Sequence, residues 1–306
     1  MNKMRIVYMG TPDFAVPTLE RLIEKHEVVG VFTQPDKPKG RHMTLTPPDV
    51  KVCAEAHNIP VFQPESVKHG EAMPILNDLK PDVIVVAAYG QILKNDILEF
   101  PKYGCINAHG SILPKYRGAA PIQRAVIDGE KEAGVTSMLM GEGLDTGDML
   151  ITKKVTIGEN ETAGELFDRL ANLAADVIEE TLENITEITP IPQNDAESSY
   201  AKMLSKEDCP IDWTRTAQQI HDQVRGLNPW PTASTIYNSV IFKVHSTLLT
   251  QNKSKNKPGT ITTDKGRIFV ATGDNDIEII ELQPQGGKRM DAKSYLLGHT
   301  LEGDFE

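Results

Sequence analysis

Two hydrophobic patterns alternate along the first 186 residues of this 306-residue chain. Short β-branched and apolar runs predict strands, and runs with apolar residues three or four positions apart predict helices between them. Strands are predicted at 5–9, 28–33, 83–88, 105–108 and 135–140, and helices at 14–25, 49–58 and 162–183. Thr162 and Glu165 are spaced as a capping box at the start of the last helix. Strands separated by helices predict an α/β fold with a doubly wound parallel sheet.

The predicted strand 83–88 is apolar on both faces, as expected of a central strand in a parallel sheet. Ligands of such sheets bind beyond the carboxyl ends of the strands. Tyr89 and Gly90 follow this strand directly, and Asn107 and His109 lie at the end of the next one. These two strand ends are therefore the expected place for a site.

The composition changes after the long helix. Pro190, Pro192 and several small polar residues predict a linker over 187–198. It would separate a first domain, 1–186, from a second, 199–306. In the second domain a short helix is predicted at 216–225, and short strands with turn signals predict a small β-barrel. Those strands are expected at 234–237, 240–246, 259–262, 267–271 and 277–282.

Groups suited to carbonyl chemistry gather after the strand 105–108. Alternate residues of a strand face the same side, so Asn107 and His109 would point together, about 6–7 Å apart along the chain. The polar loop 143–148 could add the carboxylate of Asp145. Alone, such a histidine is more often structural, and Asn107 or the loop could simply form turns. Together, beside Gly and Pro residues, they favour acyl-type chemistry on a carbonyl carbon.

Charge and cysteine content narrow the function further. The formal net charge of −11 argues against indiscriminate nucleic-acid binding, which would need a local basic patch such as Lys253, Lys255 and Lys257. From charge alone, a solvated loop is favoured there. Three cysteines without a C-x-x-C pair argue against a disulfide framework or a zinc site and fit a reducing compartment.

Several cofactor and targeting signals are absent from the sequence. The turn after the first strand, 10–13, is not G-x-G-x-x-G, so the sheet does not imply NAD, and there is no Walker loop. The apolar run 4–9 does not resemble a signal peptide, and no apolar segment reaches the ~20 residues that span a bilayer. We therefore expect a cytoplasmic protein without a metal, a membrane partner or an obligate protein partner.

Three long motifs, 107–114, 117–123 and 143–150, resemble those of the folate-dependent formyltransferases. Shorter matches to the members of that family that formylate methionyl-tRNA lie at 10–14, 31–36, 200–202, 211–213 and 228–231. The resemblance covers nearly the whole chain. It implies a Rossmann-like catalytic domain and a C-terminal OB-fold-like barrel that binds tRNA. It also implies formyl transfer from 10-formyltetrahydrofolate to methionyl-initiator tRNA, for translation initiation.

The resemblance also implies roles for individual residues. Asn107, His109 and Asp145 would be the catalytic trio. The folate would lie against Ser111, Ile112, Leu113 and Pro114, with Tyr89 and Gly90 at the neighbouring strand end. The loop 34–51 would reach the tRNA acceptor stem through Lys37, Lys39, Arg41 and His42.

The expected chemistry agrees with these roles. When an amine attacks the formyl carbon, the carbonyl oxygen becomes an oxyanion that Asn107 and His109 can stabilise, and losing one such donor typically costs about 100–1,000-fold in rate. Asp145 would orient His109 and stabilise its imidazolium form. The attacking amine must also lose a proton, either directly or through water.

Three departures from the family pattern affect details of the site. Gly141 replaces a usual Asp and could loosen the loop that carries Asp145. Ile112 replaces Leu, a swap that keeps side-chain volume. The segment 41–45 is less basic than in many relatives, which predicts fewer phosphate contacts and a weaker salt dependence of tRNA binding.

Two other readings stay open from the sequence. Glycinamide ribonucleotide formyltransferase lacks the second domain, but sugar-nucleotide formyltransferases share both domains and the trio, so only the loop 34–51 and the lysines at 253–257 favour tRNA. The other reading is a non-catalytic RNA-binding protein on an enzyme scaffold. The presence of all three residues of the trio argues against it.

Overall fold

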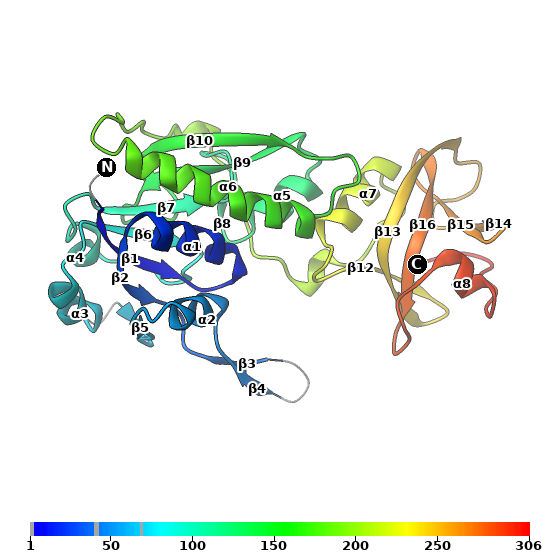
Figure 1. Cartoon of the computed structure of the whole chain (residues 1–306). Helices are drawn as coiled ribbons and strands as arrows, with labels where there is room; N and C mark the ends of the chain where they lie inside the picture. Colours follow the sequence, from blue (N-terminus) through cyan, green and yellow to red (C-terminus); the bar gives the residue numbers. More distant parts are fainter. Residues whose placement is uncertain (1–2, 40–42, 68–69) are drawn as a thin grey trace. The chain divides into compact units, whose positions relative to one another are not determined.

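A computed structural model describes residues 3–39, 43–67 and 70–306 of the chain. Two compact units are present, each built from several stretches of sequence (Figure 1). The first comprises Met1–Gly118, Ala133–Val155 and Phe167–Ala201, and the second comprises Ala119–Glu132, Thr156–Leu166 and Lys202–Glu306. The domain borders that the sequence places at 186 and 199 remain predictions.

The first unit is built on a seven-stranded sheet with the order β10-β9-β7-β6-β1-β2-β5. Its strands are β1 (Arg5–Gly10), β2 (Glu27–Phe32), β5 (Val61–Phe62), β6 (Val83–Ala87), β7 (Cys105–His109), β9 (Glu132–Leu139) and β10 (Met149–Thr156). The strands from β5 to β7 in this order are parallel. The α/β, Rossmann-like fold class is thereby confirmed.

The strand predicted at 135–140 forms, but it runs antiparallel to its neighbour, whereas a doubly wound parallel sheet would require it to be parallel. β9 is antiparallel to β7, with Thr136 opposite His109. A parallel return requires a crossover, usually a helix packed on the sheet. The helix between the two strands, α5 (Pro121–Ile127), instead belongs to the second unit and contacts α7 there. The chain therefore re-enters the sheet antiparallel.

Alternate residues of the central strands bury both faces of this sheet. Val7 and Ile84 belong to a core that includes residues of α3 and α4. On the other face, the Tyr8 hydroxyl donates to the Ala15 carbonyl, 2.5 Å away, just before α1. Both faces are covered, as parallel sheets require. The helices are α1 (Val16–Lys25), α2 (Asp49–Ala56), α3 (Ala72–Leu79), α4 (Asn95–Leu98) and α6 (Ala163–Glu183), with 3-10 turns at Asp13–Ala15 and Asp195–Glu197.

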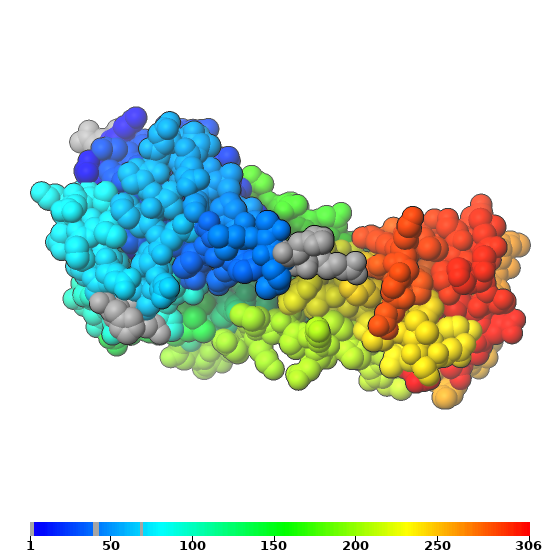
Figure 2. Space-filling model, turned by 90° about the horizontal axis from the view of Figure 1, so that it is seen from below, coloured from blue at the N-terminus to red at the C-terminus, as the bar shows by residue number. Residues whose placement is uncertain are grey.

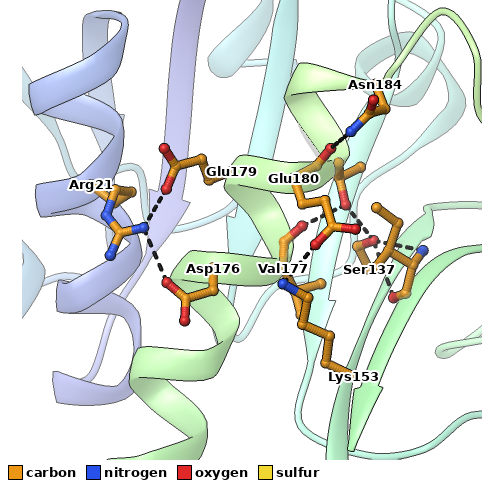
Figure 3. Close-up of polar contacts among 10 residues, drawn as sticks. Arg21, Ser137, Lys153, Asp176, Val177, Glu179, Glu180 and Asn184 are labelled. Atoms are coloured by element: carbon orange, nitrogen blue, oxygen red, sulfur yellow. Dashed lines mark hydrogen bonds and ion pairs between the residues drawn. The ribbon is translucent and has the colours of Figure 1, made fainter.

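Helix α6 is tied to its neighbours on two sides (Figure 3). On one side Arg21 of α1 pairs with Asp176 at 3.0 Å and also with Glu179. On the other side Lys153 of β10 pairs with Glu180 at 2.6 Å. These surface pairs each contribute little energy, but together they connect α1 to β10 through α6.

The loop predicted after the second strand contains a short antiparallel hairpin of β3 (Lys37–Lys39) and β4 (Thr44–Thr46). At its base Asp36 accepts hydrogen bonds from Gln63 at 2.7 Å and Lys51 at 3.0 Å. These donors, Gln63 first, lower the pKa of the Asp36 carboxyl. Described parts of the hairpin are exposed on the surface of the first unit, in blue in Figure 2.

The second unit combines α5 and α7 with an antiparallel sheet ordered β12-β13-β16-β15-β14, and β17 pairs with β16. The predicted C-terminal OB-fold-like β-barrel domain is confirmed as an antiparallel β domain. Its further elements are α7 (Ala217–Gly226), β12 (Ala233–Tyr237), β13 (Val240–Lys253), β14 (Ile261–Asp264), β15 (Arg267–Ala271), β16 (Asn275–Pro284), β17 (Met290–Asp291), α8 (Ala292–Leu296) and a 3-10 turn at Lys206–Asp208.

An extended segment, 303–306, connects the two edges of this sheet. At the β14 edge Ile261 donates its N–H to the segment at 2.8 Å, and at the β12 edge the segment donates to the Ile236 carbonyl at 2.9 Å. The sheet thus closes on itself, as expected of a small barrel. From this segment Phe305 enters the core and stacks on Trp213, with ring centroids 5.7 Å apart.

Candidate active site

The candidate active site lies at the carboxyl end of β7, where Asn107 and His109 alternate on one face of the strand. Both residues are largely buried, with 8% and 6% of their surface exposed. Within the described part of the chain, no group hydrogen-bonds the side-chain amide of Asn107. As far as the described residues show, its N–H donors are therefore available to a ligand.

The two ring nitrogens of His109 both face oxygen atoms. Nε2 lies 2.8 Å from the Tyr116 carbonyl, which can only accept, so Nε2 carries the proton of this hydrogen bond. Nδ1 lies 3.7 Å from Oδ2 of Asp145, an ion-pair distance rather than a hydrogen bond. A protonated His109 would present one N–H to each oxygen. The structure thus brings the predicted trio together at one strand end.

A backbone donor holds the carboxylate of Asp145. Its Oδ2 atom accepts the Gly118 N–H at 2.8 Å. Gly118 belongs to β8 (Arg117–Gly118), which pairs with β11 (Tyr200–Ala201). The φ angle of Gly118 is 110°, and a Cβ there would lie 2.6 Å from a ring carbon of Tyr200. Only glycine fits this position, and its N–H is thereby held facing the carboxylate.

The segment predicted to contact the folate, Ser111 to Pro114, is braced by hydrogen bonds. Ser111 and Leu113 are buried, and Ile112 and Pro114 are half-buried. The Ser111 hydroxyl donates to the Lys115 carbonyl at 2.7 Å. Thr136 of β9 donates to the Ser111 carbonyl at 2.8 Å and accepts the Leu113 N–H at 3.2 Å. These hydrogen bonds hold the segment in place beside His109, and its contact with folate stays a prediction.

Tyr89 and Gly90 follow β6 as the sequence indicated. Tyr89 is 2% exposed and belongs to the core of the first unit, where burial raises the pKa of its hydroxyl. Its carbonyl accepts hydrogen bonds from Thr11 at 2.9 Å and Gln34 at 3.3 Å. Tyr89 therefore links three strand ends through its backbone, and a role toward folate stays a prediction for both residues.

The residues predicted to bind tRNA are only partly described. Lys37 and Lys39 lie on β3, and Lys37 is exposed. Arg41 and His42 lie outside the described residues. Binding of tRNA by these four residues stays a prediction.

Two residues of this site were not singled out from the sequence. Thr136 hydrogen-bonds the segment from Ser111 to Pro114 beside His109, and Gln193 hydrogen-bonds the carbonyls of Asp145 and Gly147 at 2.8 and 2.7 Å. Thr136 faces the strand end only through the antiparallel pairing of β9. Gln193 lies in the predicted linker, where the sequence carries no periodic signal. The nearest sequence feature that could have pointed to Gln193 is the short motif at 200–202, which resembles the family.

Within residues 3–39, 43–67 and 70–306, no group of three or more His, Cys, Asp or Glu side chains could hold a metal ion. In the same residues no helix is long and apolar enough to cross a membrane.

An α/β sheet followed by an antiparallel β unit is the fold of a class of transferase enzymes. Residues 4–182 match the family described as formyl transferase, and residues 203–300 match the formyl transferase C-terminal domain. The chain belongs to the formyl transferase family.

Relatives with known names extend this result along the whole chain. The methionyl-tRNA formyltransferase of Alkaliphilus oremlandii is 51% identical over 303 residues, which cover 98% of either chain. That of Clostridioides difficile is 50% identical, with the same coverage.

Solved structures at lower identity share the fold. The N-formyltransferase from Helicobacter canadensis, in complex with folinic acid and dTDP-3-aminofucose, has a TM-score of 0.68 at 21% identity. The match covers 90% of this chain and 98% of that one. HypX from Aquifex aeolicus, in complex with tetrahydrofolic acid, has a TM-score of 0.65 at 15% identity, covering 97% of this chain and 47% of that one.

Proposed function

We propose that this protein transfers a formyl group from 10-formyltetrahydrofolate to the amino group of methionyl-initiator tRNA. The product, N-formylmethionyl-tRNA, serves translation initiation in the cytoplasm. The observation that carries the reaction is the assembly of Asn107, His109 and Asp145 at the end of β7. The 51% identity to a methionyl-tRNA formyltransferase over nearly the whole chain supports methionyl-tRNA as the acceptor.

In the proposed reaction, the neutral amine of the methionyl group attacks the formyl carbon. A new C–N bond forms, the carbonyl oxygen becomes an oxyanion, and the bond from that carbon to N10 of the folate then breaks. The proton lost by the amine balances the one gained by N10. Asn107 is suited to the oxyanion, because within the described ranges no group bonds its amide donors, and they lie in a largely buried place where a hydrogen bond is strong.

His109 takes a different part in this proposal. Its Nε2 proton is already used by the Tyr116 carbonyl, so a direct bond to the oxyanion would require that contact to be exchanged. Its ring, paired with Asp145 at 3.7 Å, would otherwise act through positive charge beside the reacting oxygen. Catalytic hydrogen bonds often tighten only when substrate is bound, so both routes fit the geometry.

The acceptor side of the proposal rests on the hairpin and the second domain. The exposed Lys37 on β3, together with Lys39, Arg41 and His42, would meet the phosphates of the acceptor stem. The antiparallel barrel at 199–306 would supply further contacts to the tRNA. The proposed function requires neither a membrane nor an obligate protein partner.

The decisive experiment offers 10-formyltetrahydrofolate with each of three acceptors: charged initiator tRNA, charged elongator tRNA and an amino-sugar nucleotide. We expect formylation of the initiator tRNA at the highest kcat/KM. Preferential formylation of the sugar nucleotide would refute the acceptor, and no formylation of any amine would refute the reaction.

A further inference from the structure

Gln193 lies in the segment predicted as a linker, yet it binds the loop that carries Asp145. Its Nε2 atom donates to the Asp145 carbonyl at 2.8 Å and to the Gly147 carbonyl at 2.7 Å. Its Oε1 atom accepts from Nε of Arg117 at 3.0 Å. Both N–H donors of this amide thus bind the loop that carries Asp145, and its oxygen accepts from Arg117 on β8.

The position of Asp145 depends on such support. Its backbone is in the left-handed region, with a φ of 53°, a conformation that costs energy in residues other than glycine. The neighbouring side chain, Leu144, is 54% exposed, so its packing does little to hold the loop. The bonds from Gln193 fix the carbonyl of Asp145 itself and, two residues on, that of Gly147.

Gln193 also connects the two supports of the Asp145 carboxylate. Arg117, which donates to Gln193, precedes Gly118, whose N–H binds Oδ2 of Asp145 at 2.8 Å. One side chain therefore links the backbone of Asp145 to the strand that holds its carboxylate. A shift of Gln193 would move the two ends of Asp145 relative to each other.

We propose that Gln193 is a positioning residue for formyl transfer, which keeps the Asp145 carboxylate in its place against Nδ1 of His109. This inference rests on the proposed roles of Asp145 and His109. Gln193 of the predicted linker would thus support the catalytic residues indirectly, through its bonds to the loop that carries Asp145.

The sharpest variant is Gln193→Glu, which keeps the length of the side chain and an oxygen that can accept from Arg117. It replaces both N–H donors with an oxygen that faces two carbonyl oxygens. The matched control is Asp195→Asn. Asp195 lies in the same segment and pairs with Arg117 at 2.8 Å, but its side chain is 84% exposed and bonds no atom of the Asp145 loop.

Each variant is assayed with 10-formyltetrahydrofolate and the acceptor that the parent protein formylates, and its thermal midpoint is measured. For Gln193→Glu we expect kcat to fall about 10–100-fold, as for a catalytic group misplaced by about 1 Å. KM for both substrates and the thermal midpoint should stay close to the parent values. Asp195→Asn should retain the parental kcat.

A double-variant cycle separates positioning from a general structural role. In an Asp145→Asn protein the carboxylate is already lost, so adding Gln193→Glu should reduce the residual kcat by less than about twofold. An equal loss in both backgrounds would overturn the proposal, as would a parental kcat in Gln193→Glu. If the Glu variant does not fold, Gln193→Ala is put through the same cycle, and the same outcomes decide.

Failure of this proposal can be told apart from failure of the proposed function. If the parent protein formylates an acceptor other than methionyl-tRNA, the cycle is still measured on that acceptor. If the Asp145→Asn variant alone keeps the parental kcat, the catalytic role of Asp145 is wrong, and the inference on Gln193 falls with it.

Discussion

Replacing Gly118 with alanine tests whether the close approach of β8 and β11 positions Asp145. The added Cβ would lie 2.6 Å from the Tyr200 ring and 2.9 Å from the Ala201 carbonyl, at a φ of 110°. The positive φ costs about 1–2 kcal/mol for alanine. Overpacking typically adds about 1–3 kcal/mol. We therefore expect the free energy of unfolding to fall by about 2–5 kcal/mol.

The same substitution should impair catalysis beyond its effect on stability. Relief of the clash moves the Gly118 N–H away from Oδ2 of Asp145, which it now binds at 2.8 Å. The carboxylate then loses its position beside His109, and we expect kcat to fall about tenfold or more under conditions where the protein is still folded.

Two spectroscopic signals report on the perturbation. Far-ultraviolet circular dichroism during urea unfolding follows the whole chain. Fluorescence follows the second unit, because Trp213 and Trp230 are the two tryptophans of the sequence and both belong to it. We expect Gly118→Ala to lower the urea midpoint seen by circular dichroism more than the one seen by fluorescence.

Gly141→Ala is the matched control. It lies on the loop before Asp145, and a Cβ there would meet nothing within 4 Å. Its stability should stay within about 0.5 kcal/mol of the parent protein, as for a surface substitution. If Gly118→Ala behaved like Gly141→Ala in both stability and kcat, the steric argument for Gly118 would be refuted.

Three further predictions address the oxyanion site, the barrel and pH. Asn107→Ala should lower kcat about 100–1,000-fold in steady-state formylation, with unchanged urea unfolding, because it removes an amide donor that has no hydrogen-bond partner among the described residues; a parental kcat would contradict its role. Phe305→Ala removes a buried ring, 4% exposed, that stacks on Trp213, and it should lower the free energy of unfolding measured by fluorescence by about 3–5 kcal/mol. A loss below about 1 kcal/mol would show that the segment 303–306 does not anchor the barrel. Burial lowers the pKa of His221, whose nitrogens contact the Thr247 hydroxyl at 2.9 Å and the Glu159 carbonyl at 3.1 Å. The unfolded chain binds this proton near pH 6.5, so its contribution is present above that pH and is lost as the pH falls, by up to about 1.4 kcal/mol per unit. His221→Gln should flatten the decline of the urea midpoint between pH 7.5 and 5.5, and an unchanged slope would contradict the assignment.

The sequence by itself determined the local elements of this protein. Apolar periodicity depends only on neighbouring residues, so it located the central strands and the long helix within a few positions. The capping-box spacing located the start of that helix, where Thr162 N–H donates to Glu165 at 2.8 Å and Glu165 N–H donates back to the Thr162 hydroxyl at 3.2 Å. β10 was missed because Lys153 takes a half-buried position between Ile151 and Val155, where the alternation would need an apolar residue.

Spacing on one strand likewise predicted that Asn107 and His109 share a face, and the motif match named Asp145 as their partner. Only the tertiary structure decided how Asp145 is held. Gln193 is separated from it by 48 positions, and no local periodicity encodes a contact over that distance. The direction of β9 was decided in the same way, because it depends on α5 packing on α7 rather than on the sheet. Patterns along a chain specify which face a residue occupies, whereas folding brings distant segments to that face.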